Sequence, residues 1–220
     1  YLVVKPFFDA AELPLSQACW LQATEYLRPR FRQVLAAMPV HIRQGDGFAK
    51  LLKVLGGVIA HGMSALPPAC SGAVIESTFI RCIKVGFCWG VTYPLLDDVI
   101  DSRSRFPAPE IASLKGAVAS ILSGGNVGRA DLECLNHLPH ATGLIESLME
   151  LRTLVPYEEN ITAYRLMHLA HMAQNEDSEL TIDGSHGERE IFVASTLKAA
   201  LVRVATALVA GAHVDQALLR

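Results

Sequence analysis

Three aspartates that follow a long apolar segment are the residues of this 220-residue chain best placed to do chemistry. Asp97, Asp98 and Asp101 come directly after residues 85–96, which are mostly apolar. In a helix, residues three and four positions apart share a face, so Asp97 and Asp101 are expected to point the same way with Asp98 beside them. Partly buried carboxylates this close together need a cation. Because Mg²⁺ prefers oxygen ligands and also binds phosphate oxygens, the cluster predicts a magnesium site of a kind that can neutralise a diphosphate leaving group.

A solvated, acidic helix end is the alternative interpretation, because acidic clusters are common on protein surfaces. The apolar stretch before the aspartates disfavours it, since a solvated face is not expected there. Pro94, about one turn before Asp97, is expected to kink the helix towards a cavity. His168 and His171 are spaced by three residues, but no further ligand has a spacing suited to a tetrahedral zinc site.

The periodicity of apolar residues predicts that helices position this cluster, and alternating strand patterns do not persist. Pro67-Pro68 and the loop 103–109 separate helical stretches, and the loop 181–187 precedes the last one. The sequence therefore predicts a single all-α domain over residues 1–220, a helical bundle. The helices are expected at 13–37, 47–65, 72–102, 110–122, 128–151, 159–179 and 188–210, with the apolar stretches 85–100 and 191–210 in the middle of the bundle.

Charge and cysteine content narrow the class of protein. The formal net charge is −3, which does not favour binding to nucleic acid. The five cysteines are scattered and odd in number, which predicts reduced thiols in a cytoplasmic protein. The longest apolar run, residues 85–96, is too short to cross a bilayer, so no transmembrane segment is expected.

Residues 93–101 resemble the first aspartate-rich motif of the trans-prenyltransferases and of the class I terpene synthases, which share one fold. Two further matches follow in the family's order. The segment 174–177, Gln-Asn-Glu-Asp, resembles the family's Gln-x-x-Asp segment, and Lys198 resembles its diphosphate-binding lysine. The resemblance extends over residues 85–210. It implies a bundle of the isoprenoid synthase type around a central apolar cavity, and it is compatible with a homodimer.

The resemblance also implies roles for individual residues. Asp97 and Asp101 would be the main Mg²⁺ ligands, with Asp98 supporting them, and Gln174 and Asp177 would act near the reacting carbon or the metal. The residues expected to bind diphosphate are Lys198, Arg103 and Arg105, and those expected to line the cavity are Phe87, Trp89, Tyr93 and Met172. For the aromatic residues, ordinary core packing is the alternative.

Two departures from the family pattern leave three functions open. The glycine-lysine-x-x-arginine segment that binds isopentenyl diphosphate in the family has no match between residues 47 and 80. The second aspartate motif would fall just beyond Arg220, so the chain is expected to lack the family's C-terminal helices. The first function is a class I terpene synthase that cyclises the cation of an allylic prenyl diphosphate. The others are a trans-prenyl diphosphate synthase that adds isopentenyl diphosphate, and a non-catalytic regulatory subunit of such a synthase.

Overall fold

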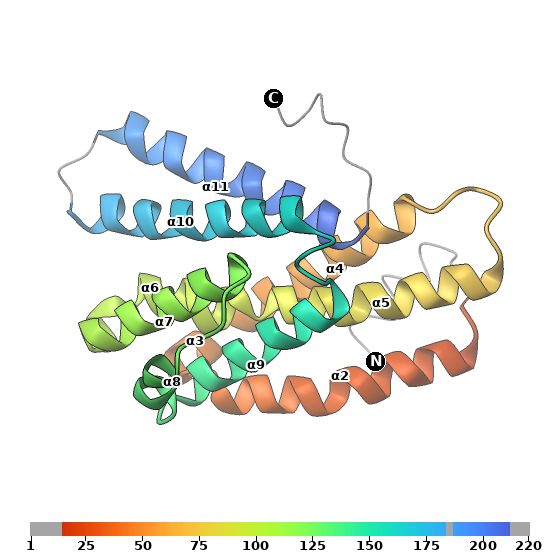
Figure 1. Cartoon of the computed structure of the whole chain (residues 1–220), viewed down its shortest axis with the longest axis horizontal. Coiled ribbons are helices and arrows are strands. Elements are labelled where there is room, and N and C mark those ends of the chain that lie inside the picture. The colour runs from red at the N-terminus through yellow and green to blue at the C-terminus, as the bar shows by residue number, and fades with distance from the viewer. Residues whose placement is uncertain (1–14, 184–186, 212–220) are drawn as a thin grey trace.

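The computed structural model describes residues 15–183 and 187–211, and every element within these ranges is a helix (Figure 1). The prediction of an all-α bundle is therefore confirmed. The elements are α2 (Gln17–Ala37), α3 (Val40–Gln44), α4 (Gly47–Ser64), α5 (Gly72–Gly90), the π-helix η1 (Tyr93–Asp97), α6 (Asp98–Asp101), the 3₁₀-helix η2 (Arg103–Arg105), α7 (Ala108–Leu122), α8 (Arg129–Leu135), α9 (Pro139–Leu154), α10 (Ile161–Asp183) and α11 (Glu188–Val209).

Helix α5 forms the centre of the bundle and leads to the aspartates. Its last six residues, 85–90, are all buried, and Ser71 caps its start by accepting a hydrogen bond from the Val74 N–H. Glycine allows helix α4 to pack closely against it. A Cβ added to Gly86 would lie 3.1 Å from Val58 Cβ, and one added to Gly90 would lie 3.1 Å from the Leu51 carbonyl oxygen. These two glycines thus let the apolar segment that was predicted to be in the core pack closely against α4.

Helices α10 and α11 form an antiparallel pair along one side of the bundle, opposite α2 (Figure 1). Helix α11 packs against α10 and α4, which leaves much of its first half uncovered. Phe192 is 71% exposed, and Val193 and Leu197 are also exposed. The prediction that residues 191–210 lie in the middle of the bundle is therefore wrong. Helix α11 is apolar nearly all round, but it packs mainly against α10 and α4 among the described helices, and one face of it is exposed.

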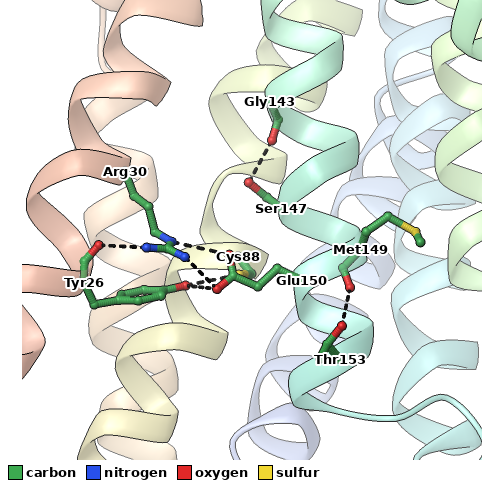
Figure 2. Close-up of polar contacts among 8 residues, drawn as sticks. All are labelled: Tyr26, Arg30, Cys88, Gly143, Ser147, Met149, Glu150 and Thr153. Carbon is green, nitrogen blue, oxygen red and sulfur yellow. Dashed lines mark hydrogen bonds and ion pairs between the residues drawn. The ribbon is translucent and has the colours of Figure 1, made fainter.

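A polar cluster joins α2 to α9 on the other side of α5 (Figure 2). Glu150 accepts hydrogen bonds from Arg30 and from the Tyr26 hydroxyl, and the Arg30 guanidinium lies 3.8 Å from the centre of the Tyr26 ring. The Cys88 thiol of α5 lies 3.6 Å from the same hydroxyl. Side chains from three helices thus meet at one point in this part of the bundle.

The helix boundaries differ from the predicted ones at several places, and Pro139 explains one of them. The single helix expected over 128–151 is two helices, because Pro139 starts α9 and its ring cannot follow a helical residue without strain. Helix α10 continues to Asp183, three residues into the expected loop. The short helix α3 was not expected at all.

Two described helices, Gly72–Asp101 and Glu188–Val209, are long and apolar enough to cross a membrane by length and composition. In the first, 83% of the most apolar window is buried inside the bundle, as expected of a core helix. In the second, 20% is buried. Length and composition in one or two helices are weak evidence for a membrane span.

Candidate functional site

A widened helical turn places the three aspartates. After α5, the chain forms the π-helix η1, in which the Asp98 N–H donates to the Tyr93 carbonyl, five residues back. Pro94 has no N–H to donate to Gly90, which removes one ordinary helical bond at this turn. The expected continuous helix over 72–102 therefore changes to a π-helix at Tyr93–Asp97, which contains the first aspartate.

The turn brings the carboxylates together. One oxygen from each of Asp97, Asp98 and Asp101 lies within 4.8 Å of the others, so a single ion could contact all three. Asp98 is 8% exposed, Asp97 is half-buried and Asp101 is exposed. Within the described residues, the buried Oδ2 of Asp98 accepts no hydrogen bond. A buried carboxylate oxygen without a donor favours a bound cation, and oxygen ligands of this kind suit Mg²⁺.

Gln174 meets the cluster from helix α10. Its side chain is buried, and its Nε2 donates to Asp101 Oδ1 over 3.2 Å. The predicted convergence of the Gln-x-x-Asp segment on the aspartates is therefore present for its first residue. The bond leaves Asp101 oriented by α10, so two distant segments of the chain fix the site.

Lys50 was missed by the sequence analysis. Its ammonium forms an ion pair with Asp98 Oδ1 and lies 3.5 Å from Asp46 Oδ1. Gly47 lets the start of α4 approach, because a Cβ there would lie 3.2 Å from Asp98 Oδ2. A lysine in the first turn of a helix opposes the helix dipole, and this unfavourable position was a signal that could have identified Lys50.

The pKa shifts show an incompletely compensated pair. Burial raises the pKa of Asp98, and the hydrogen bond and charge of Lys50 only partly offset that rise. Burial lowers the pKa of Lys50, but the hydrogen bond and charge of Asp98 outweigh it, so the net shift is upward. The ammonium therefore remains charged while the carboxylate is still costly to ionise. A second cation at Asp98 would lower that cost.

A hollow of about 520 Å³ opens beside Asp97 between α4, η1 and α11. Four basic residues, Lys50, Lys53, His61 and Arg203, contribute to its lining. The rest of the lining is largely apolar or small: Val54, Gly57, Tyr93, Asp97, Ser195, Ala199, Val202 and Thr206. An acidic cluster at one edge and basic groups around the wall suit a ligand with an anionic head and an apolar body.

A second, narrow space of about 40 Å³ lies on the other side of the shared residues Tyr93, Asp97 and Val202. Its lining is mainly apolar and includes Trp89 and Leu96. His171 also faces it, and burial lowers the pKa of this imidazole to about 4. At neutral pH the histidine is therefore uncharged. The space has the volume of very few atoms, so of the two spaces beside Asp97 the hollow of about 520 Å³ is the one that can take a ligand.

The structure places several predicted site residues. Tyr93 lines both spaces beside Asp97, and Trp89 lines the narrow one. Phe87 and Met172 require correction. Phe87 points to the opposite side of α5, into a hollow between α2 and α9, because helical rotation turns it away from Tyr93. Met172 is 49% exposed on the outer face of α10.

The remaining predicted residues are the basic ones and the second half of the Gln-x-x-Asp segment. Arg105 is exposed in η2, just after the aspartates. The side chains of Arg103, Asp177 and Lys198 lie outside the described residues. Their backbones belong to η2, α10 and α11 respectively.

No protein-family model matches the sequence, and comparisons with curated proteins and with solved structures find no match either.

Proposed function

We propose that this chain is a Mg²⁺-dependent isoprenoid synthase that ionises an allylic prenyl diphosphate. The observation that carries the proposal is the buried Asp98 carboxylate, which has an oxygen without a hydrogen bond in the described residues and lies in a cluster with Asp97 and Asp101. Such a group is costly without a cation. The basic lining of the adjoining hollow supports an anionic ligand beside that cation.

The three aspartates would hold Mg²⁺, which neutralises charge on the diphosphate when bound. Lys50, Lys53 and Arg203 would contact the outer phosphate oxygens from the wall of the hollow. The allylic C–O bond breaks heterolytically, and both of its electrons leave with the diphosphate. Tyr93 lines the hollow together with Asp97, and an aromatic face there could stabilise the allylic cation.

The first candidate product is a cyclic terpene, formed when the cation is attacked by a double bond of its own chain. The apolar part of the lining supports this outcome, because it contains few groups that could trap the cation. The second candidate is chain elongation with isopentenyl diphosphate. It is favoured by the number of basic residues in the lining, since Lys50, Lys53, His61 and Arg203 could be shared between two diphosphates.

The test is incubation of the full chain with Mg²⁺ and geranyl, farnesyl or geranylgeranyl diphosphate, each with and without isopentenyl diphosphate. Hydrocarbon or alcohol released without the co-substrate indicates a cyclase, and longer diphosphates formed only with it indicate elongation. Asp97→Asn should lower kcat at least about 100-fold. Glu25→Gln, on the exposed face of α2, is the matched control and should retain full activity.

Absence of turnover with every allylic diphosphate would contradict the enzymatic proposal. Stimulation of a separate active synthase by the inactive chain would then identify a regulatory subunit.

A further inference from the structure

Lys50 occupies a position that a second cation would need. Its ammonium contacts Asp98 and lies 3.5 Å from Asp46, at the edge of the carboxylate cluster. The side chain is 32% exposed, and it also lines the large hollow. Four flexible methylene groups connect the ammonium to the backbone, so the head group can move into that hollow without a shift of α4.

We propose that the Lys50 ammonium is a built-in cation that a divalent metal ion displaces from Asp98. Without metal, Lys50 compensates the buried carboxylate and keeps the cluster assembled. With metal on Asp98, the ammonium turns into the hollow, towards Lys53 and Arg203, where an anionic ligand would receive it. This inference rests on the metal site of the proposed function, and it concerns ion binding alone.

Electrostatic repulsion gives the expected direction. An ammonium and a divalent ion that share one carboxylate lie about 4 Å apart, where like charges at a partly buried site repel substantially. A metal on the open Oδ2 therefore favours release of Lys50 from Oδ1, and the lost ion pair lowers the metal affinity. Removing the lysine charge should raise that affinity on the order of tenfold.

Lys53 provides a matched control on the same helix. It lines the same hollow and is exposed, and the ion pair with Asp98 is made by Lys50. A general effect of net charge on cation binding would appear equally in both variants. An effect of displacement would appear only at Lys50.

The experiment is calorimetric titration of Mn²⁺ into the full chain without any prenyl diphosphate. Lys50→Met is expected to bind Mn²⁺ about tenfold more tightly than the wild type, and Lys53→Met within about twofold of it. In the Asp98→Asn background, adding Lys50→Met should cause no tightening. Equal tightening by both lysine variants, or unchanged or weaker binding by Lys50→Met, would overturn the proposal.

A second measurement covers a Lys50→Met variant that is too unstable to titrate. Lys50→Arg keeps the charge and should bind Mn²⁺ within about twofold of the wild type, so a tenfold gain in this variant would overturn the proposal. Thermal melts should show that Lys50→Met is less stable than wild type without metal and gains more from Mn²⁺. A smaller gain than wild type would also overturn it. Because no substrate is present, failure of the turnover assay leaves these outcomes interpretable.

Discussion

The ion pairs Arg30–Glu150 and Lys50–Asp98 differ in how completely the carboxylate is hydrogen-bonded. In the α2–α9 cluster, both oxygens of Glu150 accept hydrogen bonds from Arg30, and one of them also accepts from Tyr26 (Figure 2). In the aspartate cluster, Asp98 has Lys50 on one oxygen, while its other oxygen accepts no hydrogen bond within the described residues. One arginine is balanced by one carboxylate at the first site. At the second site, Lys50 pairs with one oxygen of Asp98, and Asp97 and Asp101 lie close by.

The comparison teaches that burial and incomplete hydrogen bonding of one carboxylate together separate the two sites. The side chains of Arg30 and Glu150 are 32% and 31% exposed, and their planar groups pair through two parallel contacts. Asp98 is more deeply buried and less well compensated. A structural pair minimises its own free energy, whereas a binding site retains an uncompensated group for its ligand.

The largest expected effect comes from neutralising one carboxylate at each site. If the proposed function holds, Asp98→Asn should lower kcat with an allylic diphosphate by about 1,000-fold, because the proposed metal would lose its most buried ligand. Glu150→Gln should leave kcat within about twofold, since it lies across α5 from the hollow. Steady-state assays at saturating Mg²⁺ measure both. Equal losses in the two variants would remove the distinction between the sites.

A pH effect of up to about 3 kcal/mol is expected on the aspartate side, from His171. Burial lowers its pKa from 6.5 to about 4, so between these values the unfolded chain binds one more proton than the folded chain. The free energy of unfolding from this group is therefore complete above pH 6.5 and is lost as the pH falls towards 4. Urea unfolding of wild type and His171→Leu at pH 7 and pH 4.5 measures the contribution. The exposed His61→Leu is the control, and an identical pH dependence in the two variants would contradict the assignment.

Removing the arginine of the Arg30–Glu150 pair should lower the free energy of unfolding by about 2 kcal/mol. Arg30→Met leaves Glu150 partly buried without its cation and removes the contact of the guanidinium with the Tyr26 ring. Adding Glu150→Gln to Arg30→Met should recover part of the loss, because no uncompensated charge remains. Chemical denaturation of the two single variants and the double variant gives the coupling energy, and strict additivity would refute a compensated pair.

The smallest expected effect is stabilisation by metal, which should appear on one side only. At a Mg²⁺ concentration ten times Kd, binding to the folded state adds about 1.4 kcal/mol. The wild type and Glu150→Gln should therefore melt at higher temperature with Mg²⁺ than with a chelator. Asp98→Asn should show little difference in differential scanning fluorimetry. If the melting temperature of Asp98→Asn rose with Mg²⁺ as much as that of the wild type, the metal would have to bind outside the cluster.

Much of the fold could be predicted from sequence, because helix periodicity is a local property. The apolar run before Asp97, the glycine at the start of α4 and the prolines at 67 and 68 are visible as letters. Pro139 was visible too, but its effect was missed when a continuous helix was drawn through it. Helix α11 was misplaced because apolar composition does not tell which neighbours are present to cover a helix.

The part of the site that depends on local sequence patterns could also be predicted. The Asp97–Asp101 spacing and the approach of Gln174 follow a recognisable order along the chain. The Lys50–Asp98 pair joins residues 48 positions apart, and no local pattern links them. The side on which Phe87 lies depends on the phase of the helix that precedes the wide turn, which the letters alone do not reveal.

The wide turn at Tyr93–Asp97 has a consequence for how such a site can arise or be lost. Each residue advances an ordinary helix by about 100°, so one inserted residue swings everything after it to a new bearing while the preceding core packing stays unchanged. The direction in which the three aspartates point is thus set by the number of residues in the turn, and not by the identity of any single side chain. Deleting Leu95 would keep every carboxylate in the chain and aim them away from the lysine on α4.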